Sequence, residues 1–96
     1  MNIENFQQEV SQNGFVIVDF YADWCGPCRL QGPILTELQA TNPFKLLKVN
    51  IEENEDLAVE QKIAALPTLQ IYKDGQLTST LVGLQSKTEL MSHLKT

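Results

Sequence analysis

The chain has 96 residues, which is enough for one domain with its own core and too few for a second. Its net charge of −5 and isoelectric point near 4.6 argue against nucleic acid or an anionic membrane as the main partner. No apolar run approaches the ~20 residues of a membrane-spanning helix, and residues 1–5 lack the apolar centre of a secretory signal. These features predict a cytoplasmic protein, in a compartment where paired cysteines are more often catalytic or metal-binding than permanently cross-linked.

Apolar spacing and turn residues predict elements that alternate along the chain in the order α-β-α-β-α-β-β-α. The helices are expected at residues 5–12, 28–40, 54–63 and from 86 onward. The strands are expected at residues 15–21, 46–51, 69–73 and 76–82. The first of these strands is apolar on both faces, which is typical of a central strand covered on two sides. The first two strands should be parallel, joined by a right-handed crossover, and the last two should form an antiparallel hairpin.

Local signals in the last third of the chain mark a turn and a helix start. Asp74-Gly75 between the last two strands is typical of a two-residue type I′ turn. Residues 86–89 read Ser-Lys-Thr-Glu, a capping box that should open the last helix. That helix is expected to turn Leu90, Met91 and Leu94 toward the core.

The only two cysteines, Cys25 and Cys28, lie in the pentad Trp-Cys-Gly-Pro-Cys at a predicted strand-to-helix junction. This spacing can close a small disulfide or supply half of a metal site. Structural zinc takes four Cys or His ligands, and the one other candidate is the distant His93, so no metal site is expected. A cysteine at a helix N-terminus meets unpaired N–H groups and the positive end of the helix dipole, which favour the reactive thiolate. The pair therefore indicates a redox-active dithiol, with a fixed structural disulfide as the alternative.

The pentad and six further motifs resemble the thioredoxin family, in the family's order, over residues 5–96. Those further motifs are Val18-Asp19-Phe20, Pro33, Lys48-Val49-Asn50, Leu66-Pro67-Thr68, Lys73-Asp74-Gly75 and Val82-Gly83. The resemblance implies an α/β thioredoxin fold in a single domain over residues 1–96, with a central mixed sheet of about four strands and helices on both faces. The family's extra N-terminal strand is expected to be reduced or missing here, which would leave the strand at 46–51 as an unprotected edge.

The resemblance also implies a protein-disulfide reductase that works by dithiol–disulfide exchange. Cys25, expected to be exposed, would attack the substrate, and Cys28, expected to be more buried, would resolve the mixed disulfide. In the family the Gly26-Pro27 dipeptide accompanies reductants. No cofactor beyond the cysteine pair is expected, and the implied partners of this monomer are a thioredoxin reductase and disulfide-containing proteins. The alternative is a binding or chaperone-like module that retains the fold, with incidental redox activity.

Asp19 interrupts an apolar run in the strand at 15–21. A buried carboxylate is costly unless it is paired or neutral, so the position indicates either a functional acid or a strand-edge residue that faces water. By resemblance Asp19 is the family's buried acid and Lys48 is its partner lysine. We expect Asp19 to take the proton from Cys28, through a water molecule, as Cys28 becomes the nucleophile.

Pro67 would, by resemblance, follow a cis peptide bond and pack against the disulfide; the alternative is a trans proline that starts a strand. The cis form would leave the backbone of Leu66 free to pair with an extended substrate segment. A mostly apolar docking surface is expected from Trp24, Gly26, Pro27, Leu66, Pro67, Val82, Gly83 and Leu84.

Overall fold

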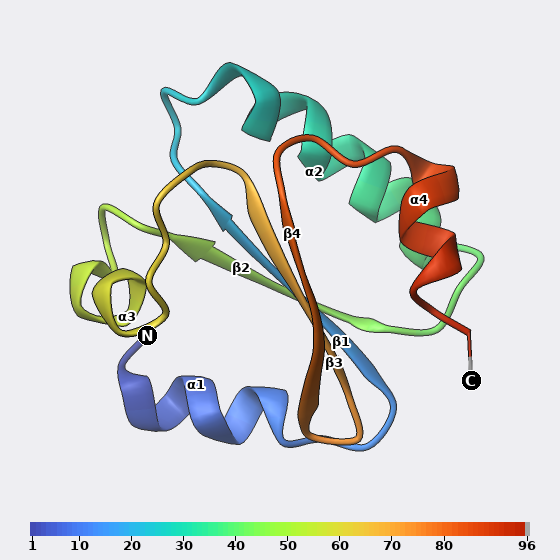
Figure 1. The fold of residues 1–96 in the computed structure, drawn as a ribbon, viewed down its shortest axis with the longest axis horizontal. Helices are drawn as coiled ribbons and strands as arrows, with labels where there is room; N and C mark the ends of the chain where they lie inside the picture. Colours follow the sequence, from blue (N-terminus) through green and yellow to red (C-terminus); the bar gives the residue numbers. More distant parts are fainter. Residues whose placement is uncertain (96) are drawn as a thin grey trace.

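The computed structural model describes residues 1–95 and follows the expected order of elements (Figure 1). Its helices are α1 (Ile3–Val10), α2 (Gly26–Gln39), α3 (Glu55–Glu60) and α4 (Lys87–Ser92). Its strands are β1 (Phe15–Tyr21), β2 (Lys45–Asn50), β3 (Thr68–Lys73) and β4 (Gln76–Val82). The sequence placed β1 and β4 at these bounds, whereas the end of α3 was predicted too late. Lys62 takes a positive φ of 57°, a left-handed conformation in which the chain has already left the helix.

The strands described within residues 1–95 form one four-stranded mixed sheet in the order β2-β1-β3-β4. β1 is parallel to β2, with α2 as the crossover between them, and antiparallel to β3. β3 and β4 form the expected antiparallel hairpin, in which Asp74 and Gly75 both have positive φ, as a type I′ turn requires. β2 therefore lies at the edge of this sheet, as the sequence predicted.

The two faces of the sheet bury different apolar clusters, because successive side chains of a strand point to opposite faces. α1 and α3 lie on one side of the strands, and α2 and α4 lie on the other (Figure 1). The first cluster includes Phe6, Val10, Val16, Val18, Phe20, Val49 and Leu57. The second includes Ile17, Leu35, Leu38, Leu69, Ile71 and Leu90. Asp19 alternates in step with Ile17 along β1, so its side chain belongs to the face that α2 covers.

α4 begins as predicted and buries less than predicted. The Ser86 hydroxyl accepts from the Glu89 N–H, and the Glu89 carboxylate accepts from the Ser86 N–H, each at 3.1 Å, which completes the capping box. Leu90 is fully buried, but Met91 is 43% exposed, so the expected core position of Met91 is wrong. Neighbouring residues on a helix point about 100° apart, and this short helix buries one side.

No helix described within residues 1–95 has the length and apolar character needed to cross a membrane.

Candidate active site

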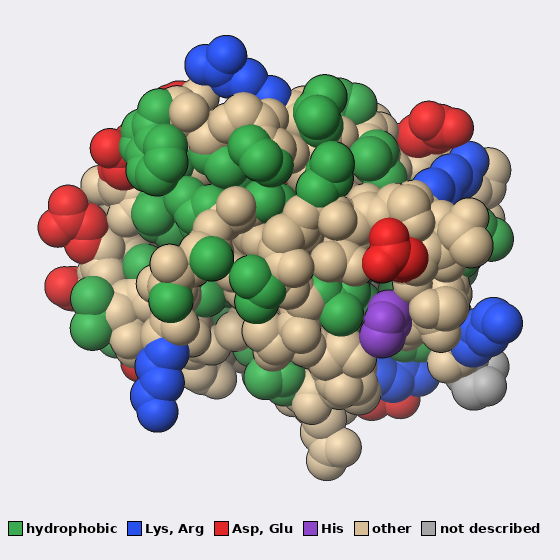
Figure 2. All heavy atoms as spheres, turned by 45° about the horizontal axis from the view of Figure 1, so that its top comes forward, with side chains coloured by type: hydrophobic (Ala, Val, Ile, Leu, Met, Phe, Trp, Pro, Cys, Tyr) green, Lys and Arg blue, Asp and Glu red, His purple; other side chains and the backbone are tan. Residues whose placement is uncertain are grey.

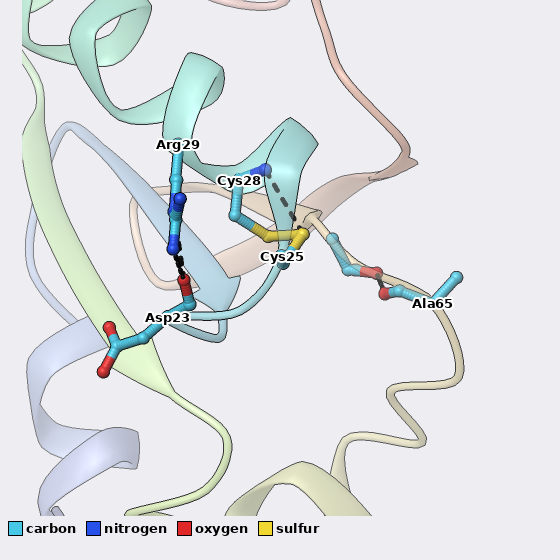
Figure 3. Close-up of a disulfide and its surroundings, with 6 residues drawn as sticks. Asp23, Cys25, Cys28, Arg29 and Ala65 are labelled. Carbon is cyan, nitrogen blue, oxygen red and sulfur yellow. Dashed lines mark hydrogen bonds between the residues drawn. A yellow bond between two sulfur atoms is a disulfide. The ribbon is translucent and has the colours of Figure 1, made fainter.

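Cys25 and Cys28 form a disulfide at the N-terminal end of α2, with their Cα atoms 5.3 Å apart (Figure 3). Cys25 is the N-cap of the helix and has extended backbone angles, while Cys28 lies in the first turn. Three hydrogen bonds hold the segment between β1 and α2. The Cys25 N–H donates to the Ala22 carbonyl at 3.1 Å, and the Arg29 guanidinium donates twice to the Asp23 carbonyl, at 2.9 and 3.1 Å.

The two sulfur atoms differ in their hydrogen bonding. The backbone N–H of Cys28 donates to the Sγ of Cys25 at 3.2 Å, so the Cys25 sulfur occupies the place of an N-cap side-chain acceptor. Pro27, within the same turn, has no N–H to offer. When the pair is reduced, this donor and the helix dipole both favour negative charge on Cys25. The geometry thus distinguishes Cys25 from Cys28.

Burial does not distinguish them, and the expected contrast between an exposed Cys25 and a sheltered Cys28 is wrong for the oxidised protein. The two residues are 5% and 6% exposed. They form one small cluster with Ala22, against which Ile51 and Leu66 pack. The disulfide holds both sulfur atoms in the same buried cluster. For this reason the positions of the two cysteines in the helix did not predict their exposure.

The two cysteines line different hollows. The hollow beside Cys25 is also lined by Trp24, Pro27 and residues 63–66, and Figure 3 shows the segment that carries Ala65 on this side. The hollow beside Cys28 is lined by residues of α2 together with Tyr21 and Lys48. The groups that surround the accessible side of Cys25 therefore differ from those beside Cys28.

Asp19 is buried, with 1% of its surface exposed, so the strand-edge alternative is excluded. Neither of its carboxylate oxygens has a hydrogen-bond partner among residues 1–95. Its neighbours across the sheet are Leu69 on β3 and Lys48 on β2. Burial raises the pKa of Asp19 from 3.8 to about 6, and the positive charge of Lys48 opposes the rise.

Lys48 is exposed and makes no direct ion pair with Asp19 in the described part of the chain. Its ammonium lies 4.9 Å from the centre of the Tyr21 ring, a cation–π distance. Helix α2 comes close at Gly32, where an added Cβ would lie 3.7 Å from the Lys48 Nζ. The lysine therefore acts on Asp19 through space, from the next strand.

The peptide bond between Leu66 and Pro67 is cis, as the resemblance implied. The Thr68 hydroxyl donates to the Ala65 carbonyl at 2.6 Å, which shapes the segment before β3. The N–H of Gly83 donates to the Pro67 carbonyl at 2.8 Å and brings the end of β4 to the same place. The cis-proline segment and the end of β4 thus meet, and Leu66 of the first packs against the cysteine pair.

The predicted docking residues divide into exposed and buried members. Large apolar side chains are exposed at Trp24 (66%), Val82 (61%) and Leu84 (43%). Figure 2 shows hydrophobic side chains gathered on the upper part of one face of the molecule. Gly26 and Pro27 are exposed, Leu66 and Gly83 are half-buried, and Pro67 is buried. The side chain of Pro67 therefore offers little surface to a docking partner.

Sequence reasoning missed Gln31, which is fully buried on α2 and is hydrogen-bonded to the backbone of Gln85. A glutamine three residues after Cys28, inside the apolar stripe of a helix, was the available signal. No group of three or more His, Cys, Asp or Glu that could hold a metal occurs among the residues described.

In this structure a mixed β-sheet is flanked by helices, a Cys-x-x-Cys disulfide lies at a helix N-terminus, and a cis-proline precedes the neighbouring strand. Together these features define a class of thiol–disulfide exchange proteins. The sequence model of the thioredoxin family matches residues 1–96, and the chain belongs to that family.

Individual relatives support the same conclusion. Thioredoxin 1 of Synechococcus elongatus is 45% identical over 92 residues, which cover 93% of this chain and 86% of that protein. The crystal structure of oxidised mitochondrial thioredoxin 3 from Saccharomyces cerevisiae has a TM-score of 0.87 at 36% identity, covering 97% of this chain and 88% of the other. The structure of a mutant thioredoxin from Halobacterium salinarum has a TM-score of 0.89 at 32% identity, covering 98% of this chain and 83% of the other. With its paired cysteines, the chain is a thiol–disulfide oxidoreductase.

Proposed function

We propose that this protein reduces disulfides in other proteins, with Cys25 as the attacking thiolate and Cys28 as the resolving thiol. The observation that carries the proposal is the hydrogen bond from the Cys28 N–H to the Cys25 sulfur. This N–H donor and the helix dipole both stabilise a negative charge on the Cys25 sulfur. Cys25 is therefore the thiol more readily ionised near neutral pH.

The exchange takes place in two steps. The Cys25 thiolate attacks one sulfur of the substrate disulfide, which forms a mixed disulfide and expels one substrate thiolate. Cys28 then loses its proton and attacks the Cys25 sulfur. This step forms the Cys25–Cys28 disulfide and releases the second substrate thiolate. Two electrons have passed from the dithiol to the substrate, and the protein is left in the oxidised state seen here.

Asp19 is the proposed acceptor for the proton of Cys28, through a water molecule. Because its pKa is about 6, Asp19 is an ionised carboxylate in most protein molecules at pH 7 and can accept a proton. Its oxygens have no hydrogen-bond partner within residues 1–95, so no donor in this part of the chain competes with the transferred proton for them. Lys48 favours the charged form of Asp19 from the neighbouring strand.

The proposed docking surface surrounds Cys25. Trp24, Val82 and Leu84 supply its exposed apolar side chains, and the backbone of Leu66, before the cis bond, is the proposed pairing edge for an extended substrate segment. Gly26, Pro27, Pro67 and Gly83 complete it.

Thioredoxins act on disulfide-containing proteins and are recycled by a reductase. We propose a thioredoxin reductase as the electron donor, with the chain acting as a monomer in a reducing, cytoplasmic compartment. We further propose that residues 1–96 act as a single domain, which agrees with the match of the family over the whole chain.

Catalytic turnover tests the proposal. Insulin, NADPH and a flavin thioredoxin reductase are combined with wild-type protein or with Cys25→Ser. We expect repeated cycles of insulin reduction with the wild type and none with Cys25→Ser. A protein that suppresses aggregation of a denatured client equally well in both forms, yet shows no turnover, would instead be a chaperone-like module.

A further inference from the structure

Gln31 is a polar side chain inside the stripe of α2 that packs on the sheet. The buried positions of this helix are Cys28, Gln31, Leu35 and Leu38, at the three- and four-residue spacing of one helix face. Gln31 is 0% exposed. A buried amide is costly unless its donor and acceptor are both paired, so the partners of this side chain indicate its role.

Those partners are the two backbone groups of a single residue. The N–H of Gln85 donates to Oε1 of Gln31 at 2.7 Å, and Nε2 of Gln31 donates to the Gln85 carbonyl at 3.2 Å. The amide therefore bonds the backbone of Gln85 as a neighbouring strand would. Gln85 lies 54 residues away in sequence, in the segment between β4 and α4. The side chain thus ties that segment to the helix that carries Cys28.

The tied segment is the one that carries part of the proposed docking surface. Gln85 directly follows Val82, Gly83 and Leu84. On the other side, the Gly83 N–H is bonded to the Pro67 carbonyl at 2.8 Å. The side chain of Gln85 adds a bond of 3.2 Å to the Gly83 carbonyl. The segment is therefore held from two directions, by the cis-proline segment and by Gln31.

We propose that Gln31 is a positioning residue that holds the segment 82–84 in place for docking of an extended, disulfide-bearing polypeptide. The inference rests on the proposed docking surface and adds the device that holds it. It predicts a distinction between substrates. A polypeptide that contacts Val82 and Leu84 needs the segment in place, whereas a small disulfide that reaches only Cys25 does not.

The variant Gln31→Met tests the role, because methionine retains the length and approximate volume of glutamine and removes both hydrogen-bonding groups. Loss of such bonds lowers the fraction of molecules with a docking-competent segment, and apparent affinity falls by that fraction. We expect the KM for insulin to rise severalfold, with an upper limit of roughly thirtyfold set by the net loss of two hydrogen bonds. The kcat for insulin, and the rate with bis(2-hydroxyethyl) disulfide, should remain those of the wild type.

Gln39→Met is the matched control. Gln39 is on the same helix and its amide also bonds a loop backbone, donating to the Phe44 carbonyl at 2.9 Å, but at the end of α2 away from the cysteines. Its KM should be unchanged. A second variant, Gln31→Leu, also removes both hydrogen-bonding groups and buries no charge, so it should raise the KM as Gln31→Met does. If Gln31→Met fails to fold, the KM of Gln31→Leu is the deciding measurement.

Two results would overturn the inference: a wild-type KM in the Gln31 variants, or an equal loss of rate with insulin and with the small disulfide. Leu84→Ala separates this failure from that of the docking surface itself. If Leu84→Ala raises the KM for insulin and Gln31→Met does not, only the role of Gln31 is wrong. If neither variant changes the KM, the docking surface is also wrong.

Discussion

Replacing Asp19 with alanine should stabilise the protein at neutral and alkaline pH. The side chain is buried, its oxygens lack partners among residues 1–95, and its pKa is raised from 3.8 to about 6. The folded state therefore holds the Asp19 proton more tightly than the unfolded state does. The extra stability that this proton gives the folded wild-type protein is fully present below pH 3.8 and is lost as the pH rises through 6.

The magnitude follows from the difference between the two pKa values. That difference is 6 − 3.8, or about 2 units, and at ~1.4 kcal/mol per unit the ionised carboxyl costs the fold about 3 kcal/mol above pH 7. The alanine variant escapes this cost and loses a small amount of packing, which does not depend on pH. Its advantage in unfolding free energy should therefore grow by roughly 2 kcal/mol between pH 4 and pH 8.

Urea melts at several pH values measure the stability, and insulin reduction between pH 6 and pH 9 (about the range in which thiols titrate) measures the chemistry. Loss of the proton acceptor should slow reduction toward the low end of the ~10²–10⁴-fold range of general acid–base catalysis, and the loss should shrink as Cys28 ionises unaided. Asp23→Ala, which removes an exposed carboxyl near the same site, is the control. A stability difference that is flat with pH would refute the burial argument. Full activity at every pH would refute the proton-transfer role.

Two further predictions concern the cysteines. Cys28→Ser should accumulate mixed disulfides with other proteins on a non-reducing gel of cell extract, because Cys25 can attack and nothing resolves the product; Cys25→Ser should show none, and the opposite pattern would exchange the roles. Limiting iodoacetamide near neutral pH should label the reduced protein mainly at Cys25, because its sulfur receives the N–H of Cys28, and equal labelling by peptide mass spectrometry would contradict that assignment.

Local features of this protein were predictable from the sequence, since they depend on neighbouring residues. The positive φ values of Asp74 and Gly75 follow from a two-residue turn between strands. The capping box between Ser86 and Glu89 follows from their three-residue spacing. The burial of Asp19 follows from its apolar flanks, and the Cys-x-x-Cys disulfide from spacing and family resemblance.

Features that need two distant segments were decided only by the tertiary structure. The equal burial of Cys25 and Cys28 depends on Ile51 and Leu66, which pack against them from other parts of the chain. Met91 is exposed because α4 is short and turns a single side toward its neighbours. Gln31 is hydrogen-bonded to the backbone of Gln85, 54 residues away, and a helical pattern cannot predict that partner. Hydrophobic spacing predicts which side of a helix or strand is buried. Only the packing of the whole chain decides which residues that side contacts, and hydrogen bonds between distant segments depend on these contacts.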